Sequence, residues 1–175
     1  MKIVGFGNSL THGYLVNRGY LNFLQDNLPL SVEIINSGIP GDTIIDGFGR
    51  LESSVLKYNP DITVIEFAVN DAFAGIPVHE FEKYYLYVLK KIKRNKIIMI
   101  PHTLFYQTDE RIVKPYYDKL KEISDKNNLL LINVSKYKLS KDELLGDKLH
   151  PNENGYKVYA KEAYNVLKEI VNGAF

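Results

Sequence analysis

The stretch DITVIEFA, residues 61–68, is an almost unbroken apolar run near the middle of the chain. Isoleucine, valine, threonine and phenylalanine dominate it, and apolar and polar positions do not alternate along it. A run of this length and composition is typical of a strand that is covered on both faces, as the strands of a parallel sheet are. The fold class is therefore predicted outward from this segment.

Four further runs have the same character, and segments with apolar residues at helical spacing separate them. This alternation predicts an α/β domain with a parallel sheet and right-handed crossovers. No repeat, low-complexity tract or linker interrupts it, so residues 1–175 are expected to form one domain. In the fourth helical segment, Pro115 is expected to cause a kink or a restart. The other predicted strands are KIVGF (2–6), VEIIN (32–36), KIIMIP (96–101) and NLLLINV (128–134), and the predicted helices are 17–27, 43–57, 79–94, 109–126 and 153–171.

Composition excludes several classes of protein. The 22 Lys and Arg residues balance 21 Asp and Glu residues, so no basic field is present to attract nucleic acid. Cysteine is absent, which rules out disulfides, thiolate metal sites and a cysteine nucleophile. The histidines lack zinc-site spacing, and we expect neither a metal nor a cofactor. With no signal peptide and no run long enough to span a membrane, we expect a cytoplasmic protein; its oligomeric state is not predicted.

The segment GFGNSLTHG, residues 5–13, follows the first predicted strand, where ligands of parallel sheets bind. It does not fit the dinucleotide fingerprint, because Leu10 stands where the third glycine is needed, and it has no P-loop Gly-Lys-Ser/Thr. It also lacks the Gly-x-Ser-x-Gly pattern of a nucleophile elbow. What remains is Ser9 at a strand-to-helix turn, either as a helix N-cap or as a nucleophile.

Candidate partners for this serine follow other predicted strands. Gly38 allows a backbone N–H to face a ligand, and the Asn70 amide is a donor that can stabilise an oxyanion. Asp147 precedes His150 by three residues, so its carboxylate can reach the imidazole Nδ1–H and leave Nε2 as a base. Each residue also has an ordinary interpretation, as a turn, a cap or a surface group. Their combination at strand ends favours the chemistry of a serine hydrolase.

These residues lie in blocks that resemble those of the SGNH hydrolases, also called the GDSL lipase/esterase family. The resemblance covers almost the whole chain, and its last block continues as Asn154-Gly155-Tyr156. Glu66, before the third block, is similar to the glutamate of the thioesterase/lysophospholipase branch. The family implies a three-layer αβα sandwich with a five-stranded parallel sheet in the flavodoxin-like order 2-1-3-4-5. The four blocks are GNSLT (7–11), NSGIPGDT (36–43), EFAVND (66–71) and DKLHPN (147–152).

The resemblance also implies roles for individual residues. Ser9 would be the nucleophile, His150 the base and Asp147 the residue that orients it. The backbone N–H groups of Ser9 and Gly38, with the Asn70 side chain, would form the oxyanion hole.

Two positions depart from the family pattern. Asn8 stands where the family has aspartate, and Ala68 where it has glycine, which affects rate and substrate size more than reaction type. Residues expected to line the pocket are Asn8, Phe73, His102, Phe105 and Tyr106. His102 is the less favoured base, because no acid lies two or three residues away to orient it.

We therefore expect a serine ester hydrolase that acts on small molecules, namely short to medium acyl esters or O-acetyl groups, through an acyl-enzyme. No long insertion is present to form a lid, which indicates a small, open pocket. Two alternatives stay open. One is an acyl thioesterase or lysophospholipase, and the other is a binding module that has kept this fold and lost catalysis.

Overall fold

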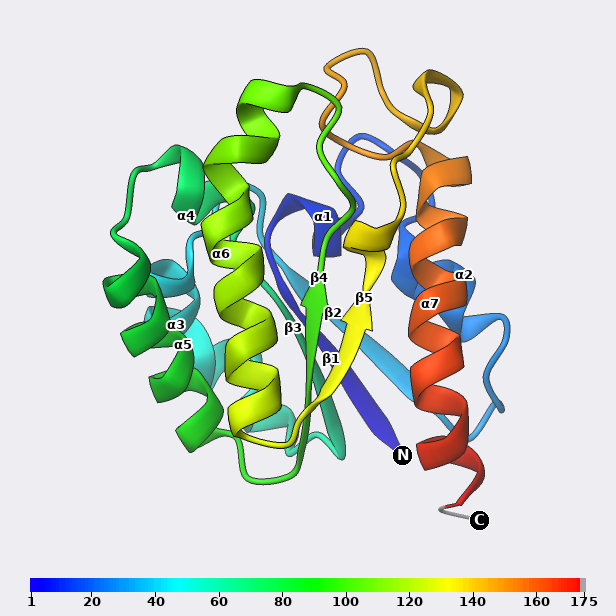
Figure 1. Cartoon of the computed structure of the whole chain (residues 1–175). Coiled ribbons are helices and arrows are strands. Elements are labelled where there is room, and N and C mark those ends of the chain that lie inside the picture. Colours follow the sequence, from blue (N-terminus) through cyan, green and yellow to red (C-terminus); the bar gives the residue numbers. More distant parts are fainter. Residues whose placement is uncertain (174–175) are drawn as a thin grey trace.

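The computed structural model describes residues 1–173 and contains a five-stranded parallel sheet in the order β2-β1-β3-β4-β5 (Figure 1). Both the α/β class and the strand order agree with the prediction from the sequence. The strands are β1 (Lys2–Gly7), β2 (Glu33–Gly38), β3 (Ile62–Glu66), β4 (Asn95–Ile100) and β5 (Leu130–Asn133).

Helices cover both faces of the sheet (Figure 1). Helices α2 (Tyr20–Gln25) and α7 (Glu153–Asn172) pack together on one face, while α3 (Ile44–Ser54), α5 (Val78–Lys91) and α6 (Gln107–Lys126) cover the other. The central strands are buried on both faces: every residue of β3 is buried, and in β4, Ile97 and Met99 belong to the core under α2 and α7, and Ile98 and Ile100 to the opposite core. The helices are α1 (Ser9–His12), α2 (Tyr20–Gln25), α3 (Ile44–Ser54), α4 (Val69–Phe73), α5 (Val78–Lys91), α6 (Gln107–Lys126) and α7 (Glu153–Asn172), with 3-10 turns at Leu56–Tyr58, Val134–Lys136 and Lys141–Glu143.

Some details differ from the sequence-based expectation. Helix α6 continues through Pro115 without a restart. Pro115 lies on the exposed side of the helix, where water can bond the carbonyl that the ring leaves unpaired. Strand β3 ends at Glu66, and the two residues after it lead into α4. Both α1 and α4 are too short to show a helical period in the sequence.

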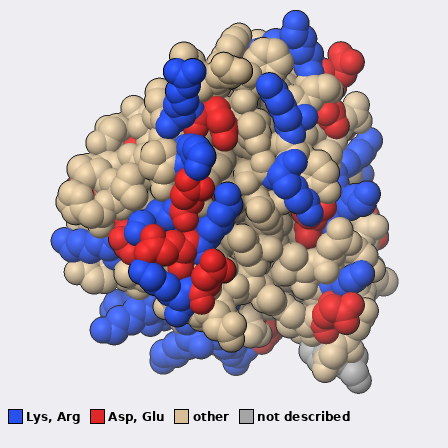
Figure 2. Space-filling model, viewed as in Figure 1, with Lys and Arg blue, Asp and Glu red and all other residues tan. Residues whose placement is uncertain are grey.

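The carboxyl ends of the strands meet at one edge of the sheet, beside α1 (Figure 1). Met1 and the end of α7 lie at the opposite edge (Figure 1). On the face seen in Figure 2, acidic and basic side chains are interspersed. Along α6 they form ion pairs between Lys114 and Asp118 and between Lys126 and Glu122. None of the helices within residues 1–173 is long and apolar enough to cross a lipid bilayer.

Candidate active site

Ser9 is the first residue of α1, directly after the turn that follows β1. The N-cap of this helix is Asn8, whose Oδ1 accepts a hydrogen bond from the Leu10 N–H at 2.9 Å. Gly13 ends the helix in the left-handed region, with φ of 83°. Because Asn8 does the capping, the hydroxyl of Ser9 is available for another role.

That hydroxyl lies beside an imidazole from the other end of the chain. Ser9 Oγ is 2.9 Å from His150 Nε2, and His150 Nδ1 is 2.7 Å from Asp147 Oδ2. These distances fit hydrogen bonds in both contacts. The structure thus brings together the serine, histidine and aspartate that the sequence singles out, in the order a nucleophile, a base and its orienter require.

The loop around Asp147 fixes the carboxylate. Its Oδ1 accepts hydrogen bonds from the N–H groups of Leu149 at 2.9 Å and His150 at 3.0 Å, while Lys148 turns the chain with φ of 59°. Burial opposes ionisation, but the hydrogen bonds from His150 and Leu149 hold the pKa of Asp147 below its usual value. Asp147 is therefore an ionised acceptor for Nδ1–H at neutral pH.

Two tyrosines support this arrangement. The ring of Tyr14 packs against the imidazole of His150, with centroids 4.8 Å apart and planes inclined by 48°. The hydroxyl of Tyr156, on α7, donates to the Ser9 carbonyl at 3.5 Å. No residue spacing points to Tyr14, because it stands in an irregular segment after α1.

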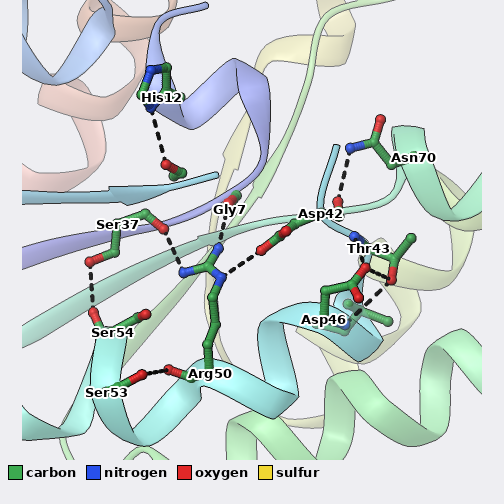
Figure 3. Close-up of polar contacts among 12 residues, drawn as sticks. Gly7, His12, Ser37, Asp42, Thr43, Asp46, Arg50, Ser53, Ser54 and Asn70 are labelled. Atoms are coloured by element: carbon green, nitrogen blue, oxygen red, sulfur yellow. Dashed lines mark hydrogen bonds and ion pairs between the residues drawn. The ribbon is translucent and has the colours of Figure 1, made fainter. Parts of the chain in front are cut away.

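The Asn70 side chain reaches from α4 to the loop after β2, where Nδ2 donates to the Asp42 carbonyl at 2.9 Å (Figure 3). An amide nitrogen carries two hydrogens, so this bond leaves one for a ligand. Asn70 is therefore bonded to the second of the four sequence blocks, NSGIPGDT (36–43).

Gly38 differs from expectation. Its N–H donates to Asn36 Oδ1 at 2.9 Å, so it is already occupied. A Cβ atom at Gly38 would lie 2.3 Å from the backbone nitrogen of His12, which shows that the glycine is needed for close packing against α1. In the same loop, Gly41 has φ of 88°, open space where a side chain would stand and an N–H without a hydrogen-bond partner in residues 1–173.

The residues expected to line a pocket differ widely in their exposure to solvent. Asn8 and His102 are buried, with 1% and 0% exposure. His102 Nδ1 lies 2.7 Å from the Tyr159 hydroxyl, and burial together with the nearby His150 lowers its pKa to about 4. His102 is thus a buried neutral side chain and not an accessible base. Phe105 packs at the edge of the core under α7, whereas Phe73 and Tyr106 are 46% and 52% exposed.

A buried carboxyl group lies beneath the serine turn. Glu66, at the end of β3, accepts hydrogen bonds from Asn8 Nδ2 at 3.2 Å and Thr11 Oγ1 at 2.9 Å. Burial raises its pKa to about 8, although these two bonds act in the opposite direction. Asn8 therefore belongs to the support of the turn and not to a pocket wall. Within residues 1–173 no cluster of three or more His, Asp or Glu side chains could hold a metal ion.

Arg50 on α3 is the centre of a second polar cluster and is not among the residues that we expected at the site (Figure 3). Its Nε lies 2.5 Å from Asp42 Oδ2, and its terminal nitrogens donate to the carbonyls of Ser37 and Gly7, each at 2.9 Å. The guanidinium also stacks on the ring of Phe6 at 4.7 Å. One sequence signal existed: Arg50 directly precedes a core residue of an amphipathic helix.

Known proteins are similar to this chain over most of its length. The sequence model described as the GDSL-like Lipase/Acylhydrolase family matches residues 6–158. An arylesterase of Vibrio mimicus is 25% identical over 159 residues, which cover 86% of this chain and 80% of that protein. Thioesterase 1/protease 1/lysophospholipase L1 of Escherichia coli (strain K12) is 23% identical over 174 residues, covering 95% of this chain and 83% of that protein. The crystal structure of the lipase/acylhydrolase from Enterococcus faecalis superposes with a TM-score of 0.87 at 29% identity, covering 97% of this chain and 96% of that one.

Proposed function

Because this chain belongs to the GDSL-like lipase/acylhydrolase family and is a carboxylic ester hydrolase, we propose that Ser9 is its nucleophile, with His150 as base and Asp147 as orienter. The family is the one that the sequence blocks resemble. The observation that carries the proposal is the continuous contact from Ser9 Oγ to His150 at 2.9 Å and on to Asp147 at 2.7 Å. Ser9 and His150, which make the first of these contacts, are 141 residues apart in the sequence.

In the proposed mechanism, His150 Nε2 takes the hydroxyl proton while Ser9 Oγ attacks the ester carbonyl. The imidazolium then gives that proton to the leaving alcohol. Water then attacks the acyl-enzyme while His150 Nε2 takes one of its protons. The imidazolium returns that proton to Ser9 Oγ, and the acid is released. Asp147 stays ionised throughout and stabilises the imidazolium.

The oxyanion of the tetrahedral intermediate needs donors that are already in place. We assign this role to the Ser9 N–H, the remaining hydrogen of Asn70 Nδ2 and the N–H of Gly41. Gly41 replaces Gly38, whose N–H is bonded to Asn36. The bond from Asn70 to the Asp42 carbonyl holds two of these donors in one unit.

The substrate class that we propose is short to medium acyl esters, including O-acetyl esters. The connection from α4 to α5 and the one from β4 to α6 are short, so neither supplies a long lid over the strand ends. A series of nitrophenyl esters of increasing chain length tests this, with kcat/KM expected to be highest from acetate to the medium chains. Activity only on long chains would contradict it.

Acyl thioesters are a second candidate, because the E. coli relative carries thioesterase and lysophospholipase in its name and matches 95% of this chain. A parallel series of acyl thioesters with the same acyl groups separates the two. A higher kcat/KM for thioesters at equal chain length would move the assignment to this second class.

Labelling with a fluorophosphonate tests the nucleophile. The parent protein should be labelled at Ser9, and Ser9→Ala should lose both labelling and ester turnover. The matched control is Ser31→Ala, at an exposed serine before the amino end of β2. It should keep both labelling and ester turnover. Equal labelling of Ser9→Ala would place the nucleophile elsewhere, and a parent that is neither labelled nor active would favour the binding module.

A further inference from the structure

Arg50 contacts two of the segments that carry proposed oxyanion donors, the end of β1 before Ser9 and the loop after β2 that contains Gly41 (Figure 3). Gly7, whose carbonyl accepts from Arg50, precedes Ser9 by two residues. Ser37 and Asp42, the other two acceptors, flank the loop that contains Gly41. One guanidinium group therefore joins the end of β1, the end of β2 and the loop that follows it.

Arg50 is also linked to Asn70, another proposed oxyanion donor, through Asp42. The Asp42 side chain accepts from Arg50 Nε, while its backbone carbonyl accepts from Asn70 Nδ2 at 2.9 Å. The side chains of Arg50 and Asp42 are only 14% and 15% exposed, so water screens their attraction weakly. Displacing Asp42 would therefore displace Asn70 and the Gly41 N–H together.

The loop itself has few other anchors. Residues 39–41 are exposed. Apart from those of Arg50, the cross-loop contacts of residues 38–42 are the bond from the Ile39 N–H to the Gly7 carbonyl, the contact of His12 Nδ1 with the Gly38 carbonyl at 3.1 Å and the Asn70 bond to the Asp42 carbonyl. Exposed segments with few hydrogen bonds to the rest of a fold open locally at a lower free energy than its core strands do. Oxyanion donors, in contrast, must be held close to their working positions before the reaction begins.

We propose that Arg50 is a positioning residue that holds the nucleophile turn, the 38–43 loop and Asn70 in register as one oxyanion-binding unit. This inference rests on the proposed function. A planar guanidinium can bond two carbonyls and a carboxylate in fixed directions, whereas a lysine ammonium is a point charge on a flexible stem. Arg50 acts through these groups and does not touch the substrate.

The chain offers a matched control. Arg18 stacks on Phe23 at 4.5 Å and pairs with Asp26, just as Arg50 stacks on Phe6 and pairs with Asp42. Arg18 is 43% exposed and has no contact with the loop. Loss of its charge and stacking should leave catalysis unchanged.

The experiment compares Arg50→Met, Arg50→Lys and Arg18→Met at a temperature where circular dichroism shows all three folded. For nitrophenyl acetate we expect kcat to fall about 100-fold in Arg50→Met and about 10-fold in Arg50→Lys, with KM within about threefold of the parent. Arg18→Met should match the parent. Hydrogen exchange followed by mass spectrometry should show amides of residues 39–43 exchanging at least about tenfold faster in both Arg50 variants, with those of β1 and β3 unchanged.

A folded Arg50→Met protein with kcat within about twofold of Arg18→Met would overturn the inference. So would unchanged exchange in residues 39–43, or exchange that accelerates equally in the loop and the strands, which would indicate a role in global stability only. If the parent shows no Ser9-dependent turnover, the proposed function fails instead. The exchange comparison then decides the positioning role without an activity assay.

Discussion

Replacing the buried Glu66 by glutamine should stabilise the protein at neutral pH and remove much of its pH dependence. The carboxyl group is fully enclosed, and burial raises its pKa from 4.5 to about 8 in the folded state. A glutamine keeps the shape of the protonated acid. Its oxygen can accept from Asn8 Nδ2, and its amide can donate to Thr11 Oγ1, so the two contacts at this site are retained.

The magnitude follows from proton linkage. Between pH 4.5 and 8 the unfolded chain loses the Glu66 proton while the folded protein keeps it, so the unfolded state binds fewer protons and stability falls as pH rises. The stability of the parent is therefore unreduced by Glu66 below pH 4.5, where the unfolded chain also keeps the Glu66 proton. At about 1.36 kcal/mol per pKa unit, ionisation of the unfolded chain lowers the stability of the parent by about 3 kcal/mol at pH 7 and about 1 kcal/mol at pH 5.

Urea unfolding at pH 5, 6, 7 and 8 measures this directly. The free energy of unfolding of Glu66→Gln minus that of the parent should grow by about 2–3 kcal/mol between pH 5 and pH 7. Titrating groups that do not interact with Glu66 cancel in the difference. A difference that stays constant, or shrinks, with rising pH would refute the reasoning.

Glu162→Gln is the control with the opposite sign. Burial would raise the pKa of Glu162, but hydrogen bonds from Lys136 and Tyr137 hold it below its usual value. Ionised Glu162 therefore contributes stability that is present above the unfolded pKa and is lost as the pH falls. Its replacement should weaken the protein most at neutral pH, where Glu66→Gln strengthens it.

Three further substitutions test the site. Asp147→Asn should lower kcat about 10³–10⁴-fold, because an amide cannot stabilise the His150 imidazolium; a change of less than about tenfold would contradict this. Asn70→Ala should lower kcat about 10²–10³-fold with folding intact by circular dichroism, whereas turnover within a few-fold of the parent would make Asn70 a structural residue bonded to Asp42. Ala68→Gly should raise the free energy of unfolding in urea by about 1 kcal/mol, because Ala68 has φ of 145° and glycine adopts that region without strain; a lower stability would count against the strain.

The strands were the most predictable part of the molecule, for a physical reason. Strands buried on both faces leave continuous apolar runs. Strands β3 and β5 lie within the runs that predicted them, and β4 begins one residue before its run. The contact between Ser9 and His150 also followed from the sequence, since residues at the carboxyl ends of parallel strands converge at one edge.

What escaped prediction depends on side-chain contacts that leave no period in the sequence. Whether Gly38 or Gly41 offers a spare N–H is decided by the Asn36 side chain, which folds back onto the backbone two residues later. The three bonds of Arg50 join segments that the sequence separates by up to 43 residues. The spacing of apolar residues indicates what one helix or strand does, whereas these contacts join different elements.

Met1 and the end of α7 lie at the sheet edge opposite Ser9 (Figure 1). A purification tag, a fluorescent fusion or a surface tether attached at Met1 therefore extends away from the proposed catalytic edge. A film of the protein anchored through that residue would present its strand ends outward, so immobilised molecules should meet dissolved esters as readily as free ones do.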